Sequence, residues 1–513
     1  TVGRAAFYGC INLIKVQFNQ GLELIGESAF SDCKALQQVT IPSSVIKLDQ
    51  CAFAVCHNLA AVNFNEGSLR VIGGNAFRSC KALKHVTIPS STAELGSYAF
   101  DGCIKLTKVH FIDGLQVIGN GAFNECTALQ QVSIPSSVTR LGDYAFRGCI
   151  NLTEVDFNDG LQIECKAFQK KTPPAILTIL GRAAFYGCIN LIKVQFNQGL
   201  ELIGKSAFRD CKALQQVTIP SSVIKLDQCA FAGCHDLAAV NFNEGSLQVI
   251  EQKVFRGCKA LKHVTIPSSV TKLGGCTFQG CCNLAEVQFK EGSLQFIGYN
   301  AFQDCTALRS VTIPSSVTTL GRSAFLRCAN LTEVTLKGGE MLLNQRFLNH
   351  GVLDGEGALN KKKVNKMISC NSIFLGCPLT TIKICFSPES MDRLSKECRL
   401  SVDGRIRDLR RLEISPDGAV LACFPVMRRS RRGIDVEDTD NQTAESMHQV
   451  LRLISFHELK ESSILIELAM WKSRFKEDRV HTDCRISVPD PAKTLIMEYC
   501  GFTDFLKPAI EGA

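Results

Sequence analysis

One stretch of the chain decides the fold: Phe30-Ser-Asp-Cys33-Lys-Ala-Leu36-Gln-Gln-Val39-Thr-Ile41-Pro42-Ser-Ser-Val45-Ile-Lys-Leu48. Val39 and Ile41 stand two residues apart with polar residues between them, which is the period of a half-buried strand. Pro42-Ser-Ser then ends the strand, because proline cannot donate to a β-ladder and serine favours a turn. A unit this small cannot bury Leu48 by itself, so the stretch predicts a coil that needs neighbours above and below.

The stretch recurs along two thirds of the chain. Phenylalanine returns about every 23 residues, at positions 7, 30, 53, 77, 100, 123, 146, 168, 185, 208, 231, 255, 278, 302 and 325, and cysteine follows three places later everywhere except after Phe168. A fixed period of this length predicts a solenoid, in which equivalent strands form a parallel sheet about 4.8 Å apart. The repeated side chains then become interior ladders, represented by Phe30, Cys33, Phe53, Cys56, Phe77, Cys80, Phe208, Cys211, Phe231 and Cys234.

The repeated pattern resembles a known family. A-F-x-x-C, then L-x-x-V-x-[F/I], then P-S-S-V-x-x-L-G is similar to the BspA-type leucine-rich repeats over roughly residues 1–340. The resemblance implies a right-handed leucine-rich-repeat solenoid of parallel β coils, common in surface and adhesion proteins of bacteria and expanded in protists and algae. It also implies binding through a repeated surface, without shared catalytic residues.

The coils come in two alternating classes. One class ends its strand with V-x-I-P-S-S, as at Ile41, and the other with V-x-F and a glycine turn, as at Phe64-Asn-Glu-Gly67. The repeating unit is therefore a pair of coils of about 46 residues.

The sequence also contains a longer duplication, which extends beyond one pair of coils. Residues 3–72 recur at 181–250 with five differences: Glu27 to Lys205, Ser31 to Arg209, Val55 to Gly233, Asn58 to Asp236 and Arg70 to Gln248. The unit that begins at Phe168 between the two blocks is shorter than the others, because Phe185 already opens the next one, and it contains Pro173-Pro174. A short coil with two prolines cannot match its neighbours, so we expect a break or kink in the stack near 165–180.

These features divide the chain into six segments. Repeat coils occupy 1–164 and 181–340, separated by an eroded coil or junction at 165–180. Residues 341–400 resemble degenerate capping coils with a lysine-rich insert, because the open ends of solenoids need covering. Residues 401–445 are expected to form a charged linker, and a capping-box pattern followed by apolar periodicity predicts a helical segment within 446–513. The predicted fold is thus a solenoid with a C-terminal capping region and a small mixed or helical domain.

The chain contains 26 cysteines, and fourteen of them occupy the same place in successive coils. We interpret these as free, buried thiols that serve as small apolar fillers, although the expected spacing of ladder neighbours does not forbid disulfides. C-x-x-C is absent, so the sequence predicts no metal site, and no cofactor is expected. Three further cysteines, Cys51, Cys229 and Cys276, stand two places before a phenylalanine and are expected to be more exposed.

No catalytic residue is predicted. Cys56-His57 and its copy Cys234-His235 place a nucleophile beside a base, but a ladder cysteine followed by a polar corner residue explains both pairs better. The sequence also contains no glycine-rich phosphate-binding loop. We therefore expect a protein that is not an enzyme, with an enzyme in the C-terminal region kept only as a weak alternative.

If the solenoid binds a ligand, the outward strand positions are the place to look. The candidate residues are Lys15, Gln17, Gln38, His85, Lys108, His110, Gln131, Glu154, Lys193, Gln216, His263 and Glu286. This stripe is polar and has few aromatics, whereas tight protein interfaces centre on aromatic or arginine anchors. It therefore favours weak, avid or glycan-like recognition, and a merely solvated face stays equally open.

Charge and hydropathy limit the classes of partner that this chain is expected to bind. The net charge of +8 is spread thinly, without the concentrated basic face of a nucleic-acid-binding protein. No apolar run is long enough to form a membrane-spanning helix. The expected partner is a protein or surface ligand, bound by a non-enzymatic scaffold; the alternative is a cell-surface adhesin or glycan-binding protein. Thr1 lies inside a coil, so we expect a longer natural chain. Reduced thiols slightly favour an intracellular location, and a location at the cell surface stays an alternative.

Overall fold

A computed structural model describes residues 1–157, 177–337, 373–385, 400, 412–414, 420–430 and 433–436. The chain divides into two units, one of Thr1–Thr332 with Asn371–Pro378 and the other of Glu333–Cys370 with Leu379–Ala513.

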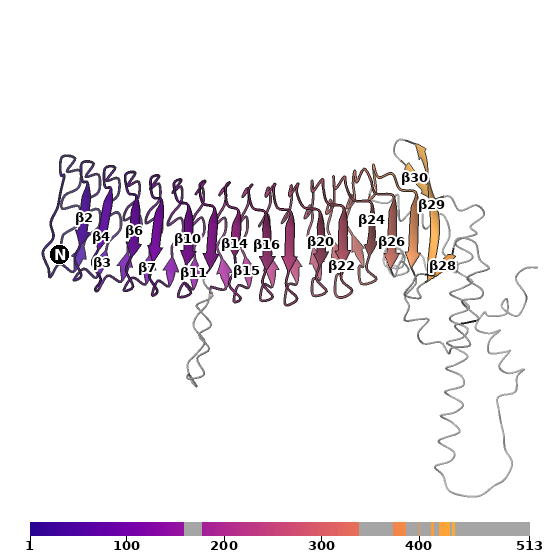
Figure 1. Cartoon of the computed structure of the whole chain (residues 1–513), viewed down its shortest axis with the longest axis horizontal. Helices are drawn as coiled ribbons and strands as arrows, with labels where there is room; N and C mark the ends of the chain where they lie inside the picture. Colours follow the sequence, from indigo (N-terminus) through magenta and orange to yellow (C-terminus); the bar gives the residue numbers. More distant parts are fainter. Residues whose placement is uncertain are drawn as a thin grey trace, which may run out of the picture. The chain divides into compact units, whose positions relative to one another are not determined.

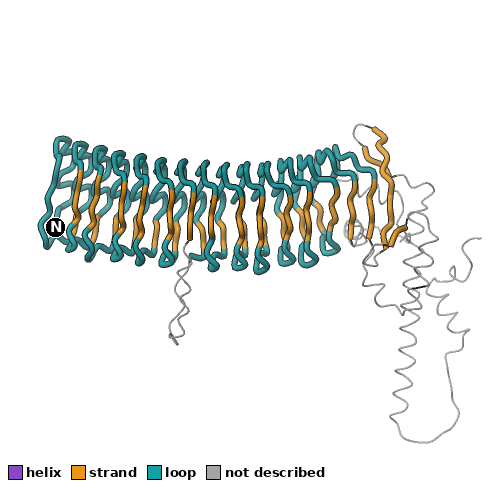
Figure 2. The backbone as a smooth tube through the Cα atoms, viewed as in Figure 1, coloured by secondary structure: helices purple, strands orange, loops and turns teal. Residues whose placement is uncertain are grey.

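The first unit is a stack of β coils, as the sequence predicts. Most coils contribute one strand of four residues and one of two, joined by turns, and the described coils contain no helix (Figures 1 and 2). Strands of the same kind pair in parallel with the next coil, for example Gln38 with Ala61 in the long strands and Lys47 with Val71 in the short ones. The predicted solenoid of parallel β coils is confirmed.

The long strands have the inward and outward alternation expected of a half-buried sheet. They are β2 (Gln38–Ile41), β4 (Ala61–Phe64), β6 (His85–Ile88), β8 (Lys108–Phe111), β10 (Gln131–Ile134), β12 (Glu154–Phe157), β14 (Lys193–Gln195), β16 (Gln216–Ile219), β18 (Ala239–Phe242), β20 (His263–Ile266), β22 (Glu286–Phe289) and β24 (Ser310–Ile313). Strands β2 to β14 form one seven-stranded sheet, while β16 with β18 and β20 with β22 form separate pairs.

The short strands form a single thirteen-stranded sheet. They are β1 (Leu24–Ile25), β3 (Lys47–Leu48), β5 (Val71–Ile72), β7 (Glu94–Leu95), β9 (Val117–Ile118), β11 (Arg140–Leu141), β13 (Ile179–Leu180), β15 (Leu202–Ile203), β17 (Lys225–Leu226), β19 (Val249–Ile250), β21 (Lys272–Leu273), β23 (Phe296–Ile297) and β25 (Thr319–Leu320).

Two ladders fill the interior between the sheets. The phenylalanine rings stack from coil to coil; Phe100 and Phe123, for example, have centroids 5.3 Å apart and planes 1° apart. Each ladder cysteine from Cys33 onward donates its thiol to the carbonyl oxygen of the phenylalanine one coil back, as Cys126 Sγ does to Phe100 O at 3.2 Å. The ten predicted ladder residues are all fully buried. Because every ring and thiol contacts the neighbouring coil, the stack is held by contacts that no coil makes alone.

The pairing of coils has a packing origin. In coils of the V-x-F class the strand phenylalanine meets the ladder ring of the next coil edge-on, as Phe64 meets Phe77 at 6.0 Å and 86°. The corners also interlock, because a Cβ on Gly67 would lie 2.2 Å from the carbonyl oxygen of Ser43 in the preceding P-S-S corner. Only glycine fits against that serine, so glycyl corners follow prolyl ones.

The expected break near 165–180 is wrong for the described stack. Phe146 and Phe185 are direct neighbours in the ladder, at 5.3 Å and 2°, and Leu141 pairs with Leu180. Leu177 is buried at the place that Leu69 takes in an ordinary coil, so one coil runs from Phe146 to Phe157 and resumes at Leu177. The prediction is wrong because the coils of Phe146 and Phe185 stack and pair directly. Residues 158–176, and with them Phe168, lie outside the described residues.

A similar gap occurs before the last ring. Phe374 stacks on Phe325 at 5.5 Å and 14°, and Cys377 Sγ donates to Phe325 O at 2.9 Å. The Phe374 segment therefore continues both ladders although the two phenylalanines lie far apart in the sequence. The lysine-rich insert between them lies outside the described residues.

The second unit contains a small mixed sheet. Its described strands are β26 (Glu333–Lys337), β27 (Thr381–Cys385), β28 (Leu412–Ile414), β29 (Val420–Ser430) and β30 (Gly433–Val436). Strands β26 and β27 are parallel, and β29 runs antiparallel to β27, β28 and β30. The interpretation of 401–445 as a linker is thus wrong in part, because the apolar residues Leu421–Pro425 of β29 pair with β27. The predicted helical segment of 446–513 lies outside the described residues.

Candidate ligand-binding face

The outward residues of the long strands are positioned by strict alternation. In β8, Val109 and Phe111 are buried while Lys108 and His110 are exposed. The apolar pair must face the ladders, and the two polar side chains therefore point away from them. The same pattern exposes Lys15, Gln17, Gln38, His85, Gln131, Lys193, Gln216, His263 and Glu286, and leaves Glu154 half-buried.

Parallel register joins the first outward residue of each coil into one row. The row runs through the paired positions Lys15, Gln38, Ala61, His85, Lys108, Gln131, Glu154 and Lys193. Gln216 lies on β16 and pairs with Ala239, and His263 pairs with Glu286 between β20 and β22. The structure thus brings most of the predicted residues of the first block together with Lys193 of the second block, and places Gln216, His263 and Glu286 on separate strand pairs.

Part of this row lines a hollow of about 580 Å³. Its polar lining includes His85, Lys108, His110, Gln131 and Glu154, all predicted from the sequence, together with Asp156 on the second outward row. Lysine and histidine come from β6 and β8, and the two acids come from β12. The hollow therefore has a basic and an acidic side, separated by the glutamine of β10. We call these six residues the polar hollow.

The edges of the polar hollow are held by local hydrogen bonds. Thr107 Oγ1 donates to Lys84 O at 3.1 Å and lies 3.3 Å from His85 Nδ1. Glu154 Oε1 accepts a hydrogen bond from Lys193 Nζ at 3.1 Å, and both side chains are about half exposed. An exposed pair of this kind adds at most about 1 kcal/mol, but it orients the carboxylate that borders the hollow.

Sequence reasoning missed two parts of this site. Thr107 and Gln130 also line the hollow, although each stands just before its strand and carries no periodic signal. The Glu154–Lys193 pair joins residues 39 positions apart, because the coil between them is interrupted by residues 158–176. Only the direct stacking of the Phe146 and Phe185 coils reveals that contact.

The ladder cysteines are poor nucleophiles in this environment. Burial raises the pKa of the Cys56 thiol to about 12, and its Sγ donates to Phe30 O at 3.1 Å. Burial, with the nearby charges of Lys81 and Lys34, lowers the pKa of the adjacent His57. A thiol this hard to ionise does not suit the nucleophile role that the Cys-His spacing suggests.

The expected exposure of the three further cysteines is wrong for two of them. Cys229 and Cys276 are buried, and only Cys51 is intermediate. All three have left-handed backbone conformations, with φ of 57° to 60°. The described ladder cysteines from Cys33 to Cys328 are free thiols, and the described residues hold no cluster of His, Cys, Asp or Glu suited to a metal ion.

Comparison with known proteins identifies the family of this repeat. The pattern of the BspA type leucine rich repeat region (6 copies) matches residues 1–106, 66–174, 164–281 and 230–353. The chain therefore belongs to the BspA-type leucine-rich repeat family, a family of repeat scaffolds. No curated protein sequence matches it. Within the part of the chain that the structure describes, no helix is long and apolar enough to cross a bilayer.

Several solved structures are similar to the chain. A leucine-rich repeat protein from Bacteroides ovatus is 29% identical with a TM-score of 0.49, over 64% of this chain and 85% of that one. A leucine rich cell surface protein from Faecalibacterium prausnitzii is 22% identical with a TM-score of 0.35, over 59% and 82%. A leucine-rich repeat protein from T. pallidum is 30% identical with a TM-score of 0.29, over 34% and 77%.

Proposed function

We propose that this chain is a non-enzymatic scaffold that recognises a protein ligand through the outward face of β6, β8, β10 and β12. The observation that carries the proposal is the polar hollow, where basic side chains from β6 and β8 face acidic ones on β12. A partner with an acidic group near Lys108 and a basic group near Asp156 complements this division. Charge complementarity of this kind sets the orientation of a partner more than its affinity.

The lining also limits the strength of the interaction. The polar hollow contains no aromatic or arginine side chain, which are the residues that dominate tight interfaces. Hydrogen bonds of about 0.5–1.5 kcal/mol each then supply most of the binding energy. We therefore expect modest affinity at one hollow, with a partner that extends along the row of outward residues.

A triple substitution tests this function. Changing Lys108, His110 and Gln131 to alanine removes three hydrogen-bonding side chains without altering the buried residues of β8 and β10, so the fold should persist. From the energies above, about 1.5–4.5 kcal/mol in total, binding to native partners in a pull-down should fall about 10- to 2,000-fold. Lys105→Ala is the matched control, because Lys105 is exposed in the same coil but does not line the hollow. Retention of every partner by the triple variant would reject the proposal.

A second candidate is glycan binding, as in a cell-surface adhesin. A neighbouring hollow of about 460 Å³ shares Gln130 and Gln131 with the first and adds Asn151, Thr153 and Asn190. Amide and hydroxyl groups of this kind suit the hydroxyl groups of a sugar. Binding of the wild-type chain to a glycan array, lost in the Gln130→Ala/Asn190→Ala variant, would favour this candidate, and a blank array would exclude it.

A further inference from the structure

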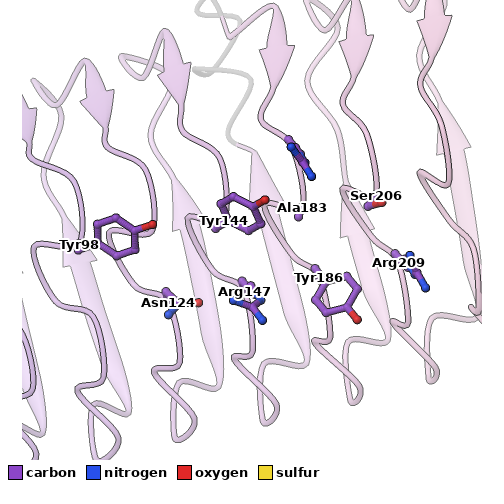
Figure 3. Close-up of a pocket in the computed structure, with 9 residues that line it drawn as sticks. Tyr98, Asn124, Tyr144, Arg147, Ala183, Tyr186, Ser206 and Arg209 are labelled. Carbon is purple, nitrogen blue, oxygen red and sulfur yellow. The ribbon is translucent and has the colours of Figure 1, made fainter.

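A third hollow, of about 480 Å³, lies on the turns around the interrupted coil. Six side chains of this hollow, which we call the Arg-Tyr cluster, carry the argument, and none belongs to a strand: Tyr98, Tyr144, Arg147, Arg182, Tyr186 and Arg209 (Figure 3). The three arginines are exposed and lie on the turns at three successive ladder rings, Phe146, Phe185 and Phe208, which are 5.3 and 5.2 Å apart. The site is separate from the polar hollow of the strands.

Guanidinium groups and phenol rings alternate in this cluster. Arg147 Cζ lies 5.9 Å from the ring centroid of Tyr144 and 5.8 Å from that of Tyr186. Arg182 lies 5.8 Å from the ring of Tyr144, and Arg209 lies 5.8 Å from the ring of Tyr186. These cation–π contacts position the arginines while their N–H groups, which lie in the guanidinium plane, stay available to an anion.

The cluster stays basic because, among the described residues, a carboxylate forms an ion pair with only one of its three arginines. Asp210 pairs with Arg209 Nε at 3.5 Å, and Asp143 Oδ1 accepts the backbone N–H of Arg182 at 2.8 Å. Among the described residues no carboxylate lies within ion-pairing distance of the Arg147 or Arg182 guanidinium. Lys205, on the same coil as Arg209, adds a further exposed positive charge. The hollow therefore presents two arginines whose charge no described carboxylate neutralises.

The duplication shows how the Arg-Tyr cluster differs from the equivalent positions in the first copy. In the first copy the equivalents of Arg182, Lys205 and Arg209 are Arg4, Glu27 and Ser31, and Arg4 forms an ion pair with Glu27 at 3.3 Å. Two of the five differences between the copies thus fall here, and both make the second copy more positive. Tyr144 and Arg147 come from the preceding block, so the complete cluster forms only where the two blocks meet.

We propose that the Arg-Tyr cluster binds sulfate or phosphate ester groups on an extended ligand. Guanidinium groups recognise tetrahedral oxyanions through paired N–H donors, and arginines at three successive ladder rings offer such donors along roughly 10 Å of the stack, two coil spacings of about 5 Å. A ligand with two or more ester groups at that separation contacts several arginines at once. This inference is independent of the function proposed for the strand face.

Calorimetric titration with two probes tests the proposal and distinguishes the source of the oxyanion. The probes are a heparin-derived hexasaccharide, which carries sulfate esters, and inositol hexakisphosphate, which carries phosphate esters. At 50 mM NaCl the full chain should bind at least one of them, more weakly as salt is raised. Arg147→Gln and Arg182→Gln should each weaken binding about 10-fold or more, since hydrogen bonds to charged groups contribute about 1.5–3 kcal/mol.

Two further variants separate a built site from general charge attraction. Arg78→Gln removes the same charge from the turn position that Arg147 holds, but Arg78 is already paired with Asp101 at 3.2 Å, so binding should stay within about two-fold of wild type. Lys205→Glu/Arg209→Ser restores the residues of the first copy, which folds with them, and should weaken binding at least about 10-fold. The proposal is overturned if neither probe binds, or if Arg78→Gln weakens binding as much as Arg147→Gln.

Discussion

Raising the pH above 9 should destabilise this solenoid through its buried thiols. Burial raises the pKa of Cys103 and of Cys149 from an ordinary value of 9.0 to about 12. The native state therefore keeps both thiols protonated at a pH where the unfolded chain ionises them. The stability that this difference contributes is complete below pH 9 and is lost as the pH rises towards 12.

The magnitude follows from the two pKa values. At pH 10 an unfolded thiol with a pKa of 9 is roughly nine-tenths ionised, so folding has to return a proton to it at a free-energy cost of about 1.4 kcal/mol. Cys103 and Cys149 together should lower the free energy of unfolding by about 2.8 kcal/mol between pH 7 and pH 10.

A comparison with the Cys103→Ala/Cys149→Ala variant isolates this effect. The variant loses two thiol–carbonyl hydrogen bonds at every pH, so at pH 7 it should be less stable than wild type. Its free energy of unfolding should fall less steeply above pH 9, and the gap to wild type should shrink by about 2.8 kcal/mol at pH 10. Lysine and tyrosine titrate in both proteins and cancel in the difference.

The assay is guanidinium unfolding followed by far-UV circular dichroism, under reducing conditions, at half-unit steps from pH 7 to 10.5. A wild-type minus variant difference that stays constant within about 0.5 kcal/mol across this range would refute the reasoning, because it would mean that the ladder thiols titrate alike in the folded and unfolded chains.

Two further predictions concern the differences between coils. Val55 is β-branched and has a φ of 61°, while its equivalent in the second copy is Gly233, so Val55→Gly should raise the free energy of unfolding by about 1 kcal/mol and Gly233→Val should lower it, as measured by denaturation. Replacing residues 158–176 with Asn-Glu-Gly-Ser, the corner of residues 65–68, makes the Phe146 to Phe185 interval as long as the ordinary interval from Phe53 to Phe77. The circular dichroism spectrum and thermal midpoint should stay close to wild type, and loss of cooperative unfolding would contradict the continuous stack across this junction.

Much of the fold could be predicted because each coil repeats the same local rules. The alternation of Val39 and Ile41 with polar residues predicts their strand, and Pro42 marks its end. Phe30 and Cys33 recur at a spacing that only stacking explains. The outward row could be named for the same reason, since a residue between two buried strand positions must face outward. The sheet of the second unit was missed because β29 pairs with β27, a strand far from it in the sequence, and local pattern does not reveal such a pairing.

The amino-acid sequence by itself determined the shape of a coil, the residues of its core ladders and the face that its polar strand residues occupy, because these depend on neighbours a few residues away. Only the tertiary structure decided which coils touch. Phe146 stacks directly on Phe185, and this contact brings Glu154 to Lys193 and Arg147 to Tyr186. The physical reason is that ring stacking and backbone pairing between matching coils do not depend on the length of chain between them.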